Sequence, residues 1–188
     1  MRKDLIVFID SGDTIVDEST EIKDENGTVL HAKMLEGAGE TLVKLHQSGY
    51  TIALVADGTK TSFDNIYTEN GLDYCFAAKA ISGELGYEKP SEIMFLHAMK
   101  ELGLKECDKP RIVMIGNNIK RDIVGANRIG ITSILLSCSP RYVMQPEKEE
   151  ETPDYVAAKP TELYDLLEQL DLQYKNRLIL TKSLVKNS

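Results

Sequence analysis

Residues 5–10 of the chain read Leu5-Ile6-Val7-Phe8-Ile9-Asp10, an unbroken apolar run that stops at a carboxylate. A short continuous run of this kind is typical of a strand buried on both faces of a parallel sheet. The pattern recurs at residues 51–55, followed by Ala56-Asp57-Gly58, and at residues 111–115, followed by Gly116-Asn117-Asn118. Polar groups therefore follow all three predicted strands.

The segments between these strands have the residue spacing of helices. Apolar residues three and four positions apart, with glycine just after several segments, predict helices there. The predicted helices span residues 36–47, 61–70, 91–102, 119–128 and 161–170, and further strands span residues 77–81, 132–136 and 155–157. In the helix over 91–102, the expected apolar residues are Ile93, Met94, Leu96 and Met99.

The alternation of strands and helices implies right-handed crossovers and a parallel sheet covered on both faces. We therefore predict an α/β fold, a Rossmann-like three-layer sandwich with a central parallel sheet. In such a sheet, ligands bind beyond the carboxyl ends of the strands. This rule selects Asp10, Asp57 and the Gly116-Asn117 turn as the place of the site.

Residues 20–30 interrupt the alternation. Asn26-Gly27 is a hairpin turn signal, and the apolar residues Ile22 and Val29-Leu30 flank it. We predict a small β-hairpin flap over about residues 17–34, which projects over the carboxyl edge of the sheet.

The domain organisation follows from these elements. Residues 1–170, with the flap included, are predicted to form a single domain, and residues 171–188 a C-terminal tail. The basic residues of that tail outnumber its single acid, Asp171, and apolar residues lie between them. Two interpretations stay open: an extra element that packs on the domain or a partner, and a partly ordered terminus.

Composition narrows the classes of function. The chain has 188 residues and a formal net charge of −8, which argues against a nucleic-acid partner. No apolar run approaches the roughly 18 residues of a membrane span, and the first apolar run is too short for a signal peptide. The three cysteines, Cys75, Cys107 and Cys138, have no paired spacing and fit reduced thiols. We therefore expect a cytoplasmic protein with no nucleic-acid or membrane partner.

A few side chains are suited to phosphate chemistry. Asp10, at the end of a buried strand, can bind a hard cation or attack phosphorus, although an aspartate there can also simply begin a turn. Lys89 precedes Pro90 at a helix start, where an ammonium would neutralise an anion; a surface lysine is the other interpretation. Asn117 and Asp122 can approach a Mg²⁺ held by Asp10, but Asp122 also suits the positive end of its helix.

Four segments resemble, in order, the motifs of the haloacid dehalogenase-like (HAD) superfamily, most of whose members are phosphatases. Residues 6–16 (IVFIDSGDTIV) resemble the first motif, and residues 52–58 (IALVADG) are similar to the second. Residues 86–90 (GYEKP) match the third closely, and residues 113–127 (VMIGNNIKRDIVGAN) resemble the fourth. The resemblance thus extends over residues 5–136.

The resemblance implies a Mg²⁺-dependent phosphohydrolase that acts on phosphoric monoesters of unknown size. Asp10 would be the nucleophile that forms an aspartyl-phosphate, and Lys89 would stabilise the developing charge. The implied Mg²⁺ ligands are Asp10, the backbone carbonyl of Gly12, Asn117 and Asp122. The residues implied to hold the phosphoryl group are Ala56, Asp57, Gly58 and Lys89.

Three positions depart from the family pattern. The family's general acid and base, an aspartate two residues after the nucleophile, is replaced by Gly12. The Ser or Thr that ends the second motif's strand is replaced by Ala56, and the first acid of the fourth motif is replaced by the neutral Asn117. Our hypothesis is that Asp57 or Asp13 takes over the proton transfer.

Other functions are also considered. The departures fit a catalytically weakened HAD fold that binds metal, phosphate or a protein. A receiver-type phosphoacceptor fits badly because such domains are shorter, and Gly37-Ala38-Gly39 lacks the third glycine of a dinucleotide site. The small flap implies an open site, which suits either a bulky phosphorylated substrate or a neighbouring subunit of a homo-oligomer acting as a lid.

Overall fold

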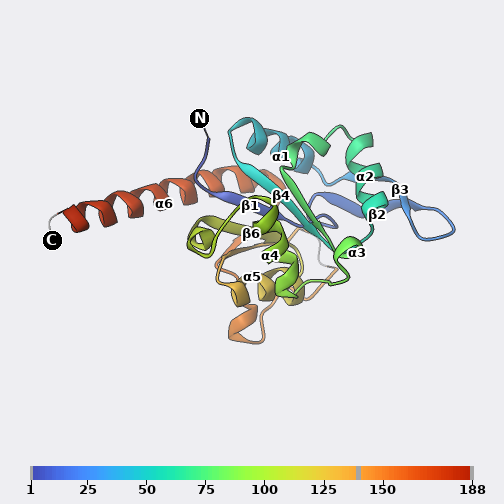
Figure 1. Cartoon of the computed structure of the whole chain (residues 1–188). Coiled ribbons are helices and arrows are strands. Elements are labelled where there is room, and N and C mark those ends of the chain that lie inside the picture. The colour runs from blue at the N-terminus through green and yellow to red at the C-terminus, as the bar shows by residue number, and fades with distance from the viewer. Residues whose placement is uncertain (1, 139–140, 187–188) are drawn as a thin grey trace.

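The computed structural model describes residues 2–138 and 141–186 of the chain. The described residues form a parallel sheet of six strands in the order β5-β4-β1-β6-β7-β8. Figure 1 labels the central strands β4, β1 and β6. The strands are β1 (Ile6–Ile9), β4 (Thr51–Ala56), β5 (Ala78–Ile81), β6 (Ile112–Gly116), β7 (Thr132–Leu136) and β8 (Tyr155–Ala157). The predicted α/β class with a central parallel sheet is confirmed.

The register of the central strands determines where the polar groups emerge. β1 lies between β4 and β6, and its last residue pairs with Leu54 on one side and with Ile115 on the other. Because the strands are parallel, their carboxyl ends lie at one edge of the sheet. Asp10, Asp57 and Asn117, which directly follow these three strands, therefore meet at the predicted edge.

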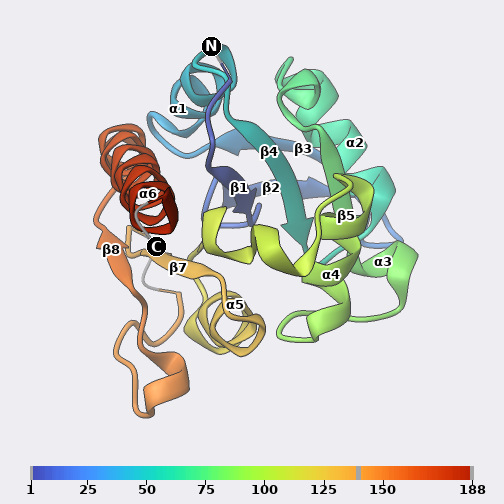
Figure 2. The same cartoon turned by 60° about the vertical axis from the view of Figure 1, so that its left-hand side comes forward.

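Helices cover both faces of the sheet (Figure 2). One face carries α1 (Ala38–Gln47), α2 (Lys60–Glu69) and α6 (Leu163–Lys186), and the other carries α4 (Glu92–Glu101) and α5 (Val124–Ile129), with the short α3 (Ser82–Leu85) after β5. Successive side chains of β1 alternate between the two cores: Val7 packs with the first set of helices and Phe8 with the second. This arrangement is the predicted three-layer sandwich.

The buried face of α4 does not include every apolar residue of the predicted helix. Ile93 and Leu96 are 40% and 42% exposed. The residues of α4 that are buried are Met94, Phe95, Ala98 and Met99. Phe95 fixes the orientation of the helix because its ring lies against Gly125 of α5, where a Cβ would overlap the ring.

The predicted flap is an antiparallel hairpin of β2 (Val16–Lys23) and β3 (Val29–Met34), separate from the main sheet. The hairpin is attached to α2. The Val29 backbone N–H donates to Ser62 Oγ at 3.0 Å, and Asn65 Nδ2 donates to the Val29 carbonyl at 2.9 Å. These bonds hold the hairpin against the start of α2, next to the carboxyl edge of the sheet.

The last helix is longer than predicted. The expected helix over 161–170 continues to Lys186, so most of the expected tail is helical; residues 187–188 lie outside the described residues. Its outer part extends away from the sheet (Figure 1), and Leu172 and Ile179 are 60% and 64% exposed. Across residues 2–138 and 141–186, no helix is both long and apolar enough to cross a membrane.

A buried aspartate fastens α6 to the sheet. Asp171 is 2% exposed, and its Oδ1 accepts the backbone N–H groups of Asp4 and Leu5 at 2.9 and 3.0 Å. Lys175 Nζ donates to the other carboxylate oxygen at 2.6 Å. The helix is therefore joined to the residues that lead into β1.

Candidate active site

The carboxyl edge of the sheet holds one buried cation between two carboxylates. Lys89 Nζ donates to Asp10 Oδ1 and to Asp122 Oδ1, each at 2.6 Å. The side chains of Lys89 and Asp122 are 2% and 0% exposed. Buried charges persist in proteins when they are paired and hydrogen-bonded. The three residues, predicted separately from the sequence, thus form one charged unit, which we call the Asp10–Lys89–Asp122 cluster.

Burial and neighbouring charges set the protonation of this cluster. Burial acts against the charged ammonium, but Asp10 and Asp122 outweigh it and raise the pKa of Lys89 above its ordinary value. Burial also raises the pKa of Asp122, and Lys89 partly opposes that rise. Lys89 is therefore a cation at neutral pH and offsets the charge on Asp10 and Asp122.

Local structure after β6 brings Asp122 to this edge. The predicted helix over 119–128 begins as a π-helical segment, Ile119–Ile123, and continues as α5. Gly116 is required at the end of β6, because a Cβ there would overlap the Asp122 carboxyl group. The Asn118 backbone N–H donates to Asp122 Oδ2 at 3.0 Å and fixes the carboxylate from the other side.

The loop after β1 holds Asp10 in place. Thr14 Oγ1 donates to Asp10 Oδ2 at 3.3 Å. Ser11 Oγ and Tyr67 Oη share a buried hydrogen bond of 2.8 Å, and Tyr67 is fully buried on α2. Sequence reasoning missed Ser11, Thr14 and Tyr67. Nothing in the sequence pairs Ser11 with a tyrosine 56 positions later; only the packing of α2 does so.

Asp57 and its neighbours support the backbone around Lys89. The Lys89 backbone N–H donates to Asp57 Oδ1 and Arg121 Nη1 donates to Asp57 Oδ2, both at 3.0 Å. Burial raises the pKa of Asp57, while Lys89 and Arg121 act to lower it. The Gly58 N–H, which the family resemblance assigns to phosphoryl oxygens, donates to Ser82 Oγ at 2.9 Å. Arg121 was not predicted as a site residue.

A carboxylate from the hairpin covers position 12. A Cβ on Gly12 would overlap Glu18 Oε1, and Glu18 Oε2 pairs with Arg141. Burial raises the pKa of the Glu18 carboxyl, whereas Arg141 acts to lower it. Asp13 points elsewhere: its Oδ1 accepts the Glu18 N–H at 3.2 Å and its Oδ2 lies 2.8 Å from Arg141 Nε. Glu18 was missed because only the fold of the hairpin brings it to Gly12.

Two hollows meet at this edge. The smaller, about 50 Å³, is bounded by the Asp10–Lys89–Asp122 cluster, Asn117 and Arg121. The larger, about 240 Å³, lies between the hairpin and the start of α2. Gly12, Glu18 and Asp57 line both. The smaller hollow suits a phosphoryl group, and the larger one suits the organic part of an ester.

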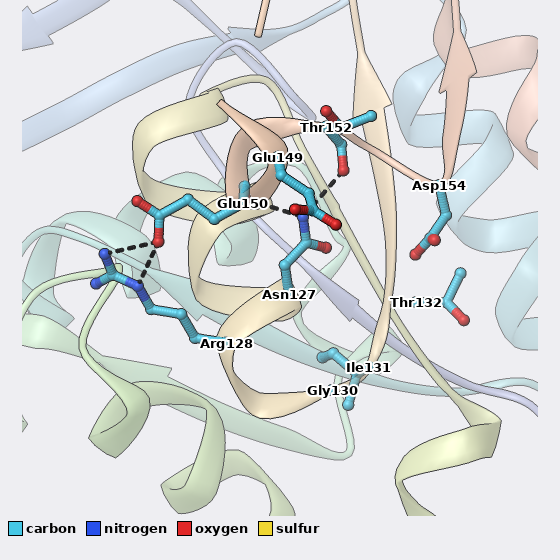
Figure 3. A pocket seen from close by; sticks show the side chains of 9 residues that line it. All are labelled: Asn127, Arg128, Gly130, Ile131, Thr132, Glu149, Glu150, Thr152 and Asp154. Atoms are coloured by element: carbon cyan, nitrogen blue, oxygen red, sulfur yellow. Dashed lines mark hydrogen bonds and ion pairs between the residues drawn. The ribbon is translucent and has the colours of Figure 1, made fainter. Parts of the chain in front are cut away.

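A third hollow, of about 610 Å³, lies at the opposite edge of the sheet (Figure 3). Its wall includes Thr132, the first residue of β7, and Asp154, just before β8. Asn127 Nδ2 within it donates to the carbonyls of Glu150 and Thr152, both at 2.9 Å. This hollow is wide and its polar groups bind one another, so its size alone does not make it a ligand site.

The donors around Asp10 fit a hard divalent cation. Asp10 and Asp122 carry carboxylate oxygens and Asn117 an amide, and Mg²⁺ prefers oxygen ligands, often one or two carboxylates with water. Asn117 is 1% exposed, and its Nδ2 has no hydrogen-bond partner among the described residues. An unpaired buried N–H donor is costly, and a hydrogen-bond acceptor such as a phosphoryl oxygen would satisfy it, whereas only the amide oxygen of Asn117 could meet a cation. Among the described residues, no group of three or more His, Cys, Asp or Glu side chains is arranged so that it could hold a metal ion.

Residues 8–136 match the family model of the haloacid dehalogenase-like hydrolases. The chain belongs to this family. The matched region contains the Asp10–Lys89–Asp122 cluster and Asn117, so the resemblance drawn from the four motifs is confirmed.

Curated relatives of this HAD-like chain are phosphatases. A glyceraldehyde 3-phosphate phosphatase from Methanopyrus kandleri is 29% identical over 130 residues, which cover 69% of this chain and 54% of the relative. A ribulose-1,5-bisphosphate 5-phosphatase from Halopiger xanaduensis is 30% identical over 106 residues, which cover 56% of this chain and 43% of the relative. The chain thus spans about half the length of the curated relatives it matches.

Solved structures share the HAD-like fold. A protein from Listeria monocytogenes serotype 4b superposes with a TM-score of 0.72 at 24% identity, over 88% of this chain and 98% of that one. The HAD-hydrolase YfnB from Bacillus subtilis, bound to magnesium, superposes with a TM-score of 0.69 at 16% identity, over 89% of this chain and 99% of that one. These likenesses establish the fold.

The three residues that depart from the HAD pattern, Gly12, Ala56 and Asn117, lie in different environments. Glu18 covers the position where Gly12 lacks a side chain. The Ala56 methyl is fully buried in the core under α1 and α2 and offers no hydrogen bond. Asn117 lies at the carboxyl edge with its amide nitrogen unpaired among the described residues. The site therefore keeps the charged cluster, while the groups around it differ from the family pattern.

Proposed function

We propose that this HAD-like chain hydrolyses phosphate monoesters through an aspartyl-phosphate on Asp10, with Mg²⁺ as its cofactor. One observation carries the proposal: Lys89 Nζ lies 2.6 Å from a carboxylate oxygen of both Asp10 and Asp122, beside a hollow of phosphoryl size. A carboxylate that attacks a phosphate dianion meets charge repulsion, and a fixed ammonium lowers that barrier. The phosphatase names of the curated relatives support the same activity.

In the first step, Asp10 attacks phosphorus and the bond to the leaving oxygen breaks. Lys89 stays between Asp10 and Asp122 and compensates the charge on the nucleophile and the phosphoryl oxygens. In the second step, water attacks the aspartyl-phosphate and releases inorganic phosphate, which restores Asp10.

The residues that would hold Mg²⁺ are Asp10, Asn117, Asp122 and the carbonyl of Gly12. When bound, the ion supplies further charge neutralisation at the phosphoryl oxygens. The magnesium bound to the Bacillus subtilis HAD-hydrolase supports this choice of metal.

The substrate proposed is a small phosphate ester. The hollow beside the hairpin measures about 240 Å³ and is lined by polar groups such as Ser62 and Lys23 as well as by Phe63. Ligand pockets for drug-sized molecules begin at about 300 Å³. The volume therefore favours a small polar ester over the bulky substrate that the small flap suggests, and the names of the relatives point to small phosphorylated metabolites.

The test is Mg²⁺-dependent hydrolysis of 4-nitrophenyl phosphate and a panel of small sugar phosphates, with wild type compared with Asp10→Asn. We expect turnover that needs Mg²⁺, stops on chelation and disappears in the variant. If neither protein turns over any ester while inorganic phosphate still raises the melting temperature, the chain is the weakened, phosphate-binding HAD fold instead.

A further inference from the structure

Hydrolysis of a phosphate ester through an aspartyl-phosphate involves two proton transfers. The leaving oxygen takes up a proton when its bond to phosphorus breaks, and the attacking water gives one up later. The group that exchanges this proton must lie where the ester bond crosses from the phosphoryl hollow into the hollow for the organic part. Gly12, Glu18 and Asp57 line both hollows, and of these only Glu18 and Asp57 have carboxyl groups.

Asp57 is already engaged in holding the backbone. One of its carboxylate oxygens accepts the Lys89 N–H, and the other accepts Arg121 Nη1, both at 3.0 Å. Moving Asp57 toward a substrate would release the segment that positions Lys89. Asp13 is also directed elsewhere, because it binds the Glu18 N–H and Arg141 and does not line either hollow.

Glu18 has the geometry that the proton transfer requires. Its Oε2 pairs with Arg141, which orients the carboxyl group. Its Oε1 lies over Gly12 and, within residues 2–138 and 141–186, accepts no hydrogen bond. Gly12 makes this approach feasible, because a Cβ on any other residue would overlap Oε1. A carboxylate from β2 therefore fills the space beside Asp10 that position 12 leaves open.

We propose that Glu18 is the acid and base of the reaction, an inference that rests on the proposed phosphatase function. As Asp10 attacks and the bond from phosphorus to the leaving oxygen breaks, the Glu18 carboxyl gives its proton to that oxygen. The Glu18 carboxylate then takes a proton from water, whose oxygen attacks phosphorus while the bond to Asp10 breaks. Alcohol and inorganic phosphate leave, and Glu18 is protonated again. Arg141 is a positioning residue in this scheme.

The first experiment compares wild type, Glu18→Gln and Glu25→Gln with two esters. Glu25 is an exposed residue of the same hairpin, so its variant is the matched control. With an alkyl phosphate, whose leaving group needs a proton, we expect Glu18→Gln to lose about 10²–10⁴-fold in rate. With 4-nitrophenyl phosphate, whose leaving group does not, we expect a burst of nitrophenolate followed by slow turnover. Mass spectrometry of the intact protein should then detect phosphorylated Asp10.

The second experiment removes the carboxylate of Glu18 and introduces one at position 12, which borders the same space. Gly12 is outside the left-handed region of backbone conformation, so a side chain there meets no backbone strain. We expect Gly12→Asp alone to be impaired, because the new side chain collides with Glu18. The double variant Gly12→Asp with Glu18→Ala should recover at least tenfold in alkyl phosphate hydrolysis over Glu18→Ala.

The outcomes separate this inference from the function on which it rests. If wild type hydrolyses neither ester, the phosphatase function itself is wrong. If wild type is active and Glu18→Gln matches Glu25→Gln on both esters, Glu18 is not the acid and base. The inference would also be wrong if Glu18→Gln lost the same factor in rate on both esters, accumulated no phosphorylated Asp10 and recovered its rate at higher Mg²⁺. Glu18 would then have a metal-binding role.

Discussion

At the level of single residues, the site depends on one cation shared by two buried carboxylates. Lys89 contacts Asp10 and Asp122 at 2.6 Å each, and all three lie under the surface. Removing one member of a buried ionic group leaves the others unpaired in a medium that solvates them poorly. The lysine therefore has two roles, since it supports both the folded state and the proposed chemistry.

We expect Lys89→Met to lower the free energy of unfolding by about 3–5 kcal/mol and to abolish turnover, because two carboxylates lose their common partner. Urea unfolding at neutral pH measures this. Lys79→Met is the control, because Lys79 pairs with the partly exposed Asp64 and Asp73, and such pairs contribute at most about 1 kcal/mol. A similar small effect for both variants would contradict the structural role of Lys89.

The three residues of this cluster could be predicted because each one lies next to a recognisable feature of the sequence. Asp10 ends an apolar run, Lys89 precedes a proline at a helix start, and Asp122 lies in the first turn after Gly116-Asn117. Glu18 and Tyr67 have no such marker. Each is an ordinary residue of a strand or helix until the hairpin and α2 pack beside β1.

At the level of elements, the attachment of the hairpin to α2 determines where Glu18 lies. Val29 exchanges two hydrogen bonds with α2, through Ser62 and Asn65. A two-stranded hairpin is only marginally stable on its own in water. The folded state of the β2–β3 hairpin therefore depends on these contacts. The shape of the 240 Å³ hollow depends on them as well.

We expect Asn65→Ala to speed amide hydrogen exchange throughout β2 and β3 and to lower the free energy of unfolding by about 1 kcal/mol, since it removes the hydrogen bond from Asn65 to the Val29 carbonyl. Hydrogen-exchange mass spectrometry follows the hairpin peptides. The exposed Thr68 on the same helix provides the control variant Thr68→Ala, which should exchange like wild type. Equal protection of the hairpin in both variants would show that other contacts hold it.

Two features of the helices could not be predicted from the spacing of apolar residues. The existence, type and order of the strands and helices follow from apolar runs and glycine stops. The buried face of α4 does not, because it depends on the fit of the Phe95 ring against Gly125 on another helix. The end of α6 was placed too early for a related reason: Asp171 interrupts the apolar pattern, yet it is buried and binds the backbone before β1.

At the level of the whole molecule, Asp171 connects the C-terminal helix to the first strand. Burial acts to raise its pKa, but the hydrogen bonds from Lys175 and from the backbone of Leu5 and Asp4 outweigh it and hold the pKa below its ordinary value. A carboxyl group with a lowered pKa in the folded state stabilises that state above its unfolded pKa of about 4. This stabilisation is lost as the pH falls through the folded pKa.

We expect Asp171→Asn to lower the free energy of unfolding by about 1–3 kcal/mol at pH 7, and the difference from wild type to shrink below about pH 4. Urea unfolding at several pH values checks both parts. Asp165→Asn, at an exposed position of the same helix, should follow wild type throughout. A difference that stays constant down to pH 3 would mean that the charge of Asp171 contributes nothing.

The strand order has a consequence for how the protein is made. Asp10 and Lys89 are 79 positions apart, and Lys89 and Asp122 a further 33, although they meet within hydrogen-bonding distance. During synthesis, β1 emerges before the other strands of the sheet and cannot pair with β6 until residues 112–116 have also emerged. Contacts across such separations form late, because long loops must close before they form. The Asp10–Lys89–Asp122 cluster, on which the proposed phosphatase function depends, therefore assembles only once the centre of the sheet has closed.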